Sequence, residues 1–363
     1  MPHFLETGQV MQTTFPRLML KHAAERPSAP ALREKEYGIW QTISWQDMAT
    51  MVANMACGLH QAGLKRGEHM VVVGSNRPRL YATVLAAQSL GAIPIPLYQD
   101  AAAAECVFPM TNAEVRLCVV EDQEQVDKML EVREAYASLE RIYFDDPRGL
   151  RKYDEPGLGS VDELLAAGEI FAKQHPNFYK EQVEMGSKDD VAAMFFTSGT
   201  TGNPKGALIP HRAMIGNLTG FLCSQNWFGF EALETAENAL SPSRQLPLGS
   251  DAIFWSPADW AWTGGLMDAL LPALYFGRPI VAFKGRFSPE TAFEILDQHA
   301  ISHSFLFPTA LKAMMKAQAQ PRKRYKLVLK GLMSAGEAVG DAVFAYCRDE
   351  LGVVVNEMFG QTE

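Results

Sequence analysis

The stretch Thr197–Gly206 has a composition suited to binding a polyanion. It reads TSGTTGNPKG and comes directly after the apolar run 191–196. Its glycines permit positive φ angles and close approach of a ligand to the backbone. Its hydroxyls and backbone N–H groups can form a donor-rich concavity for phosphate oxygens, to which a lysine adds a compact cation. We therefore predict a phosphate-binding loop whose contacts come from Thr197, Ser198, Gly199, Thr200, Thr201, Gly202 and Lys205.

Two familiar phosphate-binding patterns do not fit this loop. The Walker pattern needs a second glycine before its lysine, but Pro204 occupies that position when counted from Gly199. The dinucleotide pattern G-x-G-x-x-G is also missing from the loop. A flexible surface linker is the alternative, which the abrupt change from an apolar strand to this composition disfavours.

The segment 255–265 is the second candidate for function. It reads WSPADWAWTGG and places Trp255, Trp260 and Trp262 within eight residues, with Asp259 among them. Large aromatic side chains can form the wall of an apolar tunnel for a ligand. Ordinary core packing is the alternative explanation for the same tryptophans.

Composition narrows the class of protein. The chain has 363 residues and a formal net charge of −9, which argues against general nucleic-acid binding because such proteins usually carry a basic excess. Five cysteines without a C-x-x-C pair are typical of free thiols in a reducing compartment. The N-terminal residues do not have the pattern of a secretory signal, and charged residues and prolines interrupt the apolar stretch Leu266–Phe283. We therefore expect a cytoplasmic protein with at most peripheral membrane contact.

The predicted elements alternate between strands and helices along the whole chain. In the first half, the pattern predicts strands at 70–74, 92–97, 115–120 and 141–144 and helices at 79–90 and 123–137. In the second half it predicts strands at 191–196, 252–255, 279–283, 303–307, 326–333 and 353–356 and helices at 211–223, 265–275, 289–299, 309–317 and 338–350. This order favours mostly parallel sheets covered by helices, and two prolines in 92–97 suggest a sheet edge. We expect a first α/β lobe over 10–185 and a second over 186–363.

Three segments together resemble the motifs of adenylate-forming enzymes, the superfamily of acyl-CoA synthetases, luciferases and peptide-synthetase adenylation domains. Thr197–Gly206 is similar to the phosphate loop of that superfamily over ten residues. Ser334–Ala338 (SAGEA) resembles its Gly-Glu segment beside adenine and ribose, and Asn356–Glu363 (NEMFGQTE) resembles its aromatic-Gly-x-Thr-Glu motif. The resemblance covers about Thr14 to Glu363. It implies the large N-terminal domain of these enzymes, an α/β fold of two lobes whose mostly parallel sheets pack through helices.

The resemblance implies that the chain uses ATP and Mg²⁺ to activate a small-molecule carboxylic acid and then transfers the acyl group to coenzyme A. Both reactants of the first step are anionic, so catalysis would consist mainly of positioning and charge neutralisation. The hydroxyls of the loop and Lys205 would hold the β- and γ-phosphates. Thr362 would contact the α-phosphate and the acyl oxygen, while Glu363 would hold Mg²⁺, a hard ion that prefers oxygen ligands. The nucleotide would also contact Gly336, Glu337 and Phe359, the last by stacking on adenine.

Each of these residues also has an explanation without function. A Thr-Glu pair at a strand end is often solvated surface. Phe359 could be a core aromatic, and Glu337 could be a helix N-terminal residue stabilised by the macrodipole. His211, just after the loop, is interpreted as a helix-start residue and not as a catalyst.

The residues around the expected acid pocket give a mixed indication of substrate size. Gly360 stands where acetyl-activating relatives have a bulky Trp, which leaves room for a longer acyl chain. Ser75–Pro78, Pro94–Tyr98 and Glu121–Lys128 resemble long-chain acyl-CoA synthetases, whereas Asp259–Trp262 resembles the acetyl and medium-chain branch. We expect a medium-to-long-chain fatty acid, bound in a substrate pocket formed by Trp255, Asp259, Trp260, Trp262 and Gly360.

The sequence stops at Glu363, the last residue of its motif. Members of the superfamily continue with a ribose-binding Asp, a hinge and a small C-terminal domain that carries a catalytic Lys. We therefore expect this chain to look truncated, to keep most nucleotide contacts and to have weak or no ligase activity alone. Two other hypotheses stay open: an adenylating module that loads a carrier protein, and a non-catalytic ATP-binding remnant.

Overall fold

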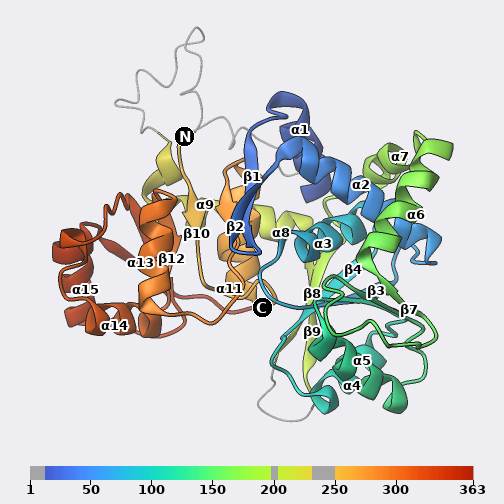
Figure 1. Ribbon diagram of the computed structural model, residues 1–363. Helices are drawn as coiled ribbons and strands as arrows, with labels where there is room; N and C mark the ends of the chain where they lie inside the picture. Colours follow the sequence, from blue (N-terminus) through green and yellow to red (C-terminus); the bar gives the residue numbers. More distant parts are fainter. Residues whose placement is uncertain (1–12, 198–202, 231–249, 363) are drawn as a thin grey trace, which may run out of the picture.

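The computed structural model describes residues 13–197, 203–230 and 250–362. Its strands form a seven-stranded, a five-stranded and a two-stranded sheet. Helices cover the two larger sheets, whose strands are largely parallel (Figure 1). This arrangement confirms the predicted α/β fold class.

The five-stranded sheet is parallel throughout and has the order β4-β3-β5-β6-β7. Its strands are β3 (His69–Val73), β4 (Ile93–Leu97), β5 (Leu117–Val120), β6 (Arg141–Phe144) and β7 (Leu158–Ser160). The apolar side chains of β3 and β5 are buried, as expected for a parallel sheet covered on both faces. The two prolines of β4 have no N–H for a further strand, and β4 does form an edge, as predicted.

Some helices of the first half pack on this sheet, and others pack on those helices. These helices are α1 (Phe15–Glu25), α2 (Trp45–Gln61), α3 (Pro78–Leu90), α4 (Ala103–Asn112), α5 (Gln123–Ala135), α6 (Val161–Gln174) and α7 (Phe178–Met185). Helix α3 is buried almost throughout, because it contacts β3 and β4 as well as β1 of the other large sheet. It ends at Gly91, whose φ of +69° gives a left-handed cap that suits glycine.

The seven-stranded sheet combines strands from both ends of the chain in the order β14-β13-β12-β10-β11-β1-β2. Its strands are β1 (Pro30–Glu36), β2 (Ile39–Ser44), β10 (Phe254–Trp255), β11 (Ile280–Val281), β12 (His303–Phe305), β13 (Gly331–Ala335) and β14 (Val355–Met358). All neighbours are parallel except the antiparallel pair β1–β2.

The sheets do not follow the expected division of the chain at 185/186. Strand β1 pairs in parallel with β11, with Leu32 opposite Ile280 and Arg33 opposite Val281. Leu32 is fully buried there. This pairing joins residues far apart in sequence, and local apolar periodicity carries no information about such a partner.

The stretch after β8 (Val191–Thr197) also differs from the prediction. A further strand, β9 (Lys205–Pro210), pairs with β8 in an antiparallel hairpin in which Thr197 lies opposite Lys205. The hairpin packs on the five-stranded sheet, because Met194 and Phe196 join the core cluster of that sheet. The predicted loop is therefore the connection of a hairpin, and the helix follows only after a second strand.

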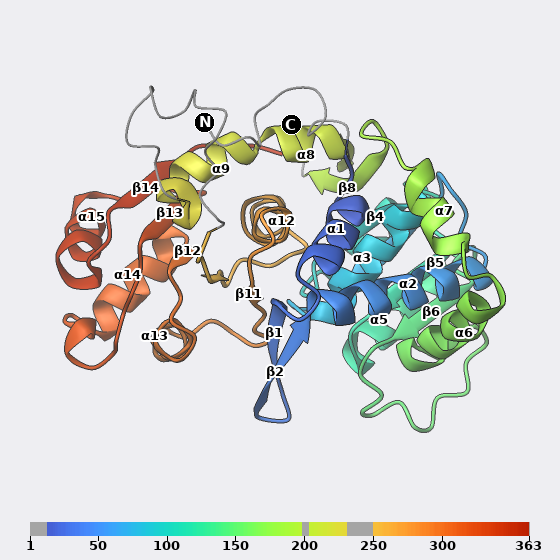
Figure 2. The same cartoon turned by 90° about the horizontal axis from the view of Figure 1, so that it is seen from above.

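The helices of the second half lie mainly on the other side of the molecule (Figure 2). They include α8 (His211–Gly216), α9 (Leu218–Ser224), α11 (Thr263–Gly265), α12 (Leu271–Tyr275), α13 (Pro289–Gln298), α14 (Pro308–Ala317) and α15 (Asp341–Tyr346). The helix predicted at 211–223 is interrupted at Asn217. His211 begins α8 and is buried, where its Nδ1 accepts the Phe15 N–H at 3.4 Å. Within the described ranges, every helix is too short or too polar to cross a bilayer.

Candidate active site

A pocket of about 800 Å³ brings several predicted site residues together. One wall comes from the end of β4, the connection that follows it and α4. Another wall comes from the facing ends of β8 and β9. The remaining lining comes from the tryptophan segment and from the end of the described chain. The lining residues are Pro96, Leu97, Tyr98, Ala101, Glu105, Cys106, Pro109, Phe195, Phe196, Thr197, Pro204, Lys205, Ala261, Trp262, Thr263, Gln361 and Thr362.

The β8–β9 hairpin places two residues of the predicted phosphate loop at this pocket. Thr197 is the last residue of β8 and Lys205 the first of β9, and the two are paired across the hairpin. Lys205 is exposed, so its ammonium group is available to an anion in the pocket. The other predicted loop residues, Ser198, Gly199, Thr200, Thr201 and Gly202, lie outside the described residues.

The end of the described chain reaches the same pocket from the seven-stranded sheet. Thr362 follows β14, and its Oγ1 lies 3.0 Å from Oγ1 of Thr263 at the start of α11. Both threonines line the pocket. Glu363, predicted to hold Mg²⁺, lies outside the described residues. No group of three His, Cys, Asp or Glu side chains is arranged for a metal ion in the part of the chain that the structure describes.

Trp262 lines the pocket and also lies beside Ser334–Ala338, the segment predicted to contact the nucleotide. Its side chain is 38% exposed and lines the pocket. The nearest atom to a Cβ placed on Gly336 is Cη2 of Trp262, at 3.7 Å, and the φ of +94° at Gly336 suits glycine. Glu337 is held by the α14 residues Thr309, at 3.1 Å, and Lys312, at 3.9 Å. The next helix, α15, begins only at Asp341, so Glu337 is not its N-terminal residue.

Phe359 and Gly360 are open to solvent. The Phe359 side chain is 90% exposed, so the alternative of a core aromatic is wrong. A Cβ placed on Gly360 would have no atom within 4 Å. Neither residue lines the pocket, whereas Gln361 and Thr362 directly after them do.

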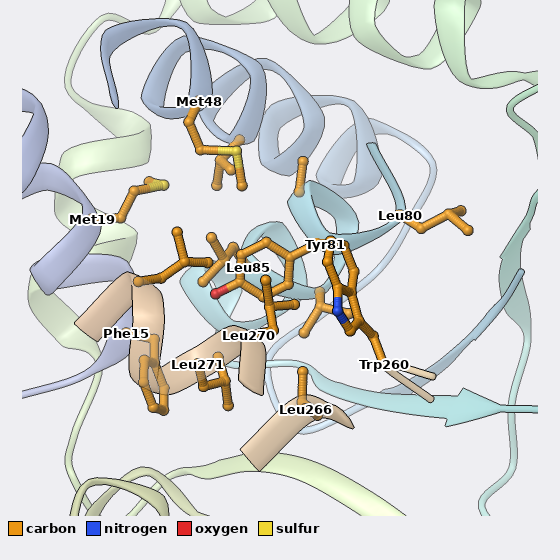
Figure 3. Packing of buried hydrophobic residues seen from close by; sticks show 14 of the residues in the cluster. Phe15, Met19, Met48, Leu80, Tyr81, Leu85, Trp260, Leu266, Leu270 and Leu271 are labelled. Carbon is orange, nitrogen blue, oxygen red and sulfur yellow. The ribbon is translucent and has the colours of Figure 1, made fainter. Parts of the chain in front are cut away.

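Two of the three tryptophans predicted for the substrate pocket are core residues instead. Trp255 is 1% exposed and belongs to a cluster that also includes Val281 and Phe293. Trp260 is buried, with its ring centroid 6.1 Å from that of Tyr81 (Figure 3). Core packing therefore explains both. Trp255 ends the short strand β10, and Trp260 and Trp262 lie in the irregular segment after it, where no fixed period shows from the sequence which side chain points inward.

Asp259 lies next to the pocket and is not part of its lining. Its Oδ1 accepts the Ala261 N–H at 2.8 Å. Burial raises the pKa of Asp259, and repulsion from Asp100 and Glu121 adds to this effect. Burial likewise raises the pKa of the pocket residue Tyr98, to which the negative charge of Asp259 contributes.

Sequence reasoning missed much of the wall contributed by the first half. Tyr98 comes directly after β4, and Cys106 and Pro109 lie on α4. The carboxyl ends of parallel strands are where ligands bind in open α/β sheets, so the position of Tyr98 after a predicted strand was an available signal. Thr263 was missed as well, although it stands next to Trp262 in the segment already singled out. A separate cavity of about 530 Å³, lined by residues such as His69 and Arg116, contains no predicted site residue.

Comparison with known proteins identifies the family of this chain. A family model described as AMP-binding enzyme matches residues 19–363. An uncharacterised acyl-CoA ligase of Bacillus subtilis is 25% identical over 346 residues, which are 95% of this chain and 58% of the relative. A long-chain-fatty-acid–CoA ligase of Mus musculus is 27% identical over 56% of this chain and 30% of its own length. An acetyl-coenzyme A synthetase of Methanothrix thermoacetophila is 24% identical over 87% of this chain and 45% of its own.

Solved structures show the same fold. The crystal structure of an acyl-CoA synthetase from Brucella canis matches with a TM-score of 0.77 and 23% identity, over 97% of this chain and 58% of that one. An anthranilate CoA ligase in complex with anthranoyl-AMP has a TM-score of 0.77 at 16% identity. The matched part is between 30% and 58% of the length of the three relatives and the Brucella canis structure, so the chain spans little more than half of any of them.

Proposed function

The chain belongs to the AMP-binding enzyme family, and from this premise we propose that it is the nucleotide- and acid-binding part of an acyl-CoA ligase. The reaction would convert a fatty acid, ATP and coenzyme A into acyl-CoA, AMP and pyrophosphate through an acyl-adenylate. One observation carries the proposal: Thr197, Lys205, Trp262 and Thr362, from three separate segments, line a single pocket. A ligand in that pocket would contact phosphate-binding and acyl-binding residues at once.

The pocket residues are suited to the first half of this reaction. An oxygen of the acid's carboxylate attacks the α-phosphorus of ATP, and the bond from that phosphorus to the pyrophosphate oxygen breaks. Lys205 would offset the negative charge on the phosphates, and the Thr197 hydroxyl would donate a hydrogen bond to them. The Thr362 hydroxyl would donate to the α-phosphate or the acyl oxygen, and in that arrangement its Oγ1 would accept from Thr263, one of the two directions open to this hydrogen bond. These residues would accelerate the step by holding two anions at attacking distance.

We include Mg²⁺ and coenzyme A in the proposal. The described lining residues offer hydroxyl and ammonium donors to phosphate, and Glu105 is the one acidic residue among them. A Mg²⁺ ion would therefore take much of its oxygen coordination from the nucleotide phosphates. Glu363, the candidate protein ligand, rests on the sequence motif alone. When bound, Mg²⁺ neutralises charge on the phosphate oxygens.

Four of the five free cysteines are buried, and we propose a cytoplasmic location, where thiols stay reduced.

For the acid, we propose a medium-to-long-chain fatty acid. Leu97, Pro109 and Phe195 contribute apolar side chains to the pocket wall. A pocket of about 800 Å³ is in the size range of sites for drug-sized ligands, and it would hold the acid together with part of the nucleotide. Gly360 does not line the pocket, so its place in this proposal rests on the sequence motif alone. Each methylene buried in such a wall would add ~0.8 kcal/mol to binding.

The test is acid-dependent exchange of labelled pyrophosphate into ATP by the purified chain, with acids from acetate to palmitate. Exchange that depends on the acid and increases with chain length supports the proposal. Exchange with acetate alone would overturn the chain-length part. ATP binding without exchange for any acid would overturn the enzyme proposal in favour of a non-catalytic nucleotide-binding protein. Thioester formation with coenzyme A, compared with a carrier-protein phosphopantetheine, then identifies the acceptor.

A further inference from the structure

A buried amide, Asn76, connects the two large sheets beside the candidate site. Its side chain is 8% exposed and lies in the loop between β3 and α3. Its Nδ2 donates to the Ala258 carbonyl at 2.8 Å, and its Oδ1 accepts the Trp260 N–H at 2.8 Å. Both partners belong to the segment between β10 and α11. One amide thus satisfies an acceptor and a donor on the same stretch of backbone, which restrains both its distance and its orientation.

The loop that carries Asn76 is itself held in place. The Ser75 N–H donates to a carboxylate oxygen of Glu121 at 2.6 Å. Arg77 is buried and pairs with Asp145 at 3.1 Å and with Glu36 at 3.3 Å. Glu121 and Asp145 follow β5 and β6 of one sheet, and Glu36 ends β1 of the other. The loop that carries the Asn76 amide is therefore bonded to residues of both large sheets.

The segment that Asn76 holds continues directly into the pocket wall. The Trp260 ring is anchored in the core near Leu80, Tyr81 and Leu266, as Figure 3 shows. The next three residues, 261–263, line the pocket, and Thr263 contacts Thr362. Asn76 does not line the pocket, so any effect it has on a ligand passes through this segment.

We propose that Asn76 is a positioning residue that holds the pocket wall 261–263 against the wall formed by β4 and α4. Its two hydrogen bonds set the distance between Trp262 and the opposite wall, and they place the Thr263 hydroxyl within reach of Thr362. The expected consequence for catalysis rests on the proposed function, because it concerns how well the acid is aligned with the nucleotide. The structural consequence, a loosened segment 256–263, does not depend on it.

The test uses Asn76→Leu, which keeps a similar volume and removes both hydrogen bonds. Gln225→Leu is the matched control, because Gln225 is also a buried amide, donates to the Ser304 carbonyl at 3.0 Å and does not line the pocket. Hydrogen–deuterium exchange of peptides that cover 256–263 measures the structural effect. Pyrophosphate exchange kinetics, resolved into kcat and KM for the acid and for ATP, measure the functional effect.

We expect faster deuterium uptake across 256–263 in Asn76→Leu and uptake there like the parent chain in Gln225→Leu. We also expect kcat/KM for the acid to fall roughly 10- to 100-fold in Asn76→Leu, with KM for ATP changed much less. Unchanged deuterium uptake in 256–263, or equal increases there in both variants, would overturn the proposal. Faster deuterium uptake together with equal losses of kcat/KM for the acid and for ATP would also overturn the proposal. If the parent chain shows no acid-dependent exchange, the proposed function fails, while the uptake comparison still decides whether Asn76 holds the segment.

Discussion

Thr263 and Thr362 are separated by 99 positions in the chain, yet their Oγ1 atoms lie 3.0 Å apart at the edge of one pocket. Thr263 begins α11 after the tryptophan segment, and Thr362 follows β14. The bond links two segments that the sequence identifies separately. Because one hydroxyl must donate and the other accept, Thr362 can donate to a ligand when Thr263 is the donor of this bond.

Removing the Thr263 hydroxyl should therefore weaken catalysis more than folding. In Thr263→Val the side-chain volume stays similar, but Thr362 loses its partner and its preferred rotamer. We expect acid-dependent pyrophosphate exchange to fall about tenfold in kcat/KM, in line with the loss of one hydrogen bond at a reacting site. Thr263→Ser keeps the hydroxyl and should retain most activity. Equal losses in both variants would show that the methyl group matters and the hydrogen bond does not.

Lys205 should contribute chiefly through its charge. Lys205→Met keeps a long apolar stem and removes the ammonium group that faces the pocket, so we expect kcat for pyrophosphate exchange to drop about 100-fold. The control is Lys173→Met, because Lys173 is a surface residue whose only described ion pair is with Glu169 on the same helix. Full activity in Lys205→Met would exclude a role for this lysine in phosphate binding.

Gly265 should tolerate no side chain. A Cβ there would lie 1.8 Å from the Asp259 carbonyl oxygen, so the pocket segment would have to move. We expect Gly265→Ala to lower the free energy of unfolding by about 1–3 kcal/mol, measured by urea denaturation. Gly216 in α8 has open space at the same position, and Gly216→Ala should stabilise the protein by ~0.5–1 kcal/mol. Destabilisation by both substitutions would contradict this steric explanation.

Asp268 should give the stability a measurable pH dependence. Burial raises the pKa of Asp268 from 3.8 to about 6, and a hydrogen bond from Asn217 opposes the shift. The folded state therefore retains a proton that the unfolded state has lost between about pH 4 and 6, so stability falls as the pH rises through this window. Asp268→Asn should match the parent chain near pH 4 and exceed it by ~1–3 kcal/mol at pH 7.5.

Asp251 is the control for Asp268, because its pKa is shifted in the opposite direction. The hydrogen bond from Lys330 lowers the pKa of Asp251, so this carboxylate contributes stability above its unfolded pKa and loses it as the pH falls. Asp251→Asn should thus be slightly less stable than the parent chain at pH 7.5, by about 0.2–1 kcal/mol, since the pair is exposed. Urea denaturation at several pH values measures both variants. A constant difference between Asp268→Asn and the parent chain across pH 4–7.5 would contradict the assignment.

Gly360 offers a direct test of acid size. Its surroundings are open, so a large side chain can be placed there without a clash at Cβ. Gly360 lies next to the pocket residue Gln361, and on the proposed function we expect Gly360→Trp to lower the ratio of kcat/KM for palmitate to that for acetate by at least about tenfold, because an indole that turns toward the pocket takes room from methylenes. Gly360→Ala adds no such bulk and should leave the ratio close to that of the parent chain. An unchanged ratio in Gly360→Trp would mean that the acyl chain takes another path.

The sequence by itself determined the α/β class and the segments that meet at the site. These features depend on local signals. Apolar runs of strand length predicted β3, β5 and β8, and a loop rich in glycine and hydroxyls after β8 indicated phosphate binding. The motif around Thr362 was recognisable for the same reason, since its residue types stand at fixed spacing.

Only the tertiary structure decided which of these residues share a pocket. It buried Trp255 of β10 and Trp260 in the core and left Trp262 at the lining, because packing across the whole molecule decides which of these side chains points inward. It also paired β1 with β11 and placed Thr263 beside Thr362. Such contacts join positions far apart in the chain, and they form because apolar area and hydrogen-bonding groups must be satisfied across the whole molecule.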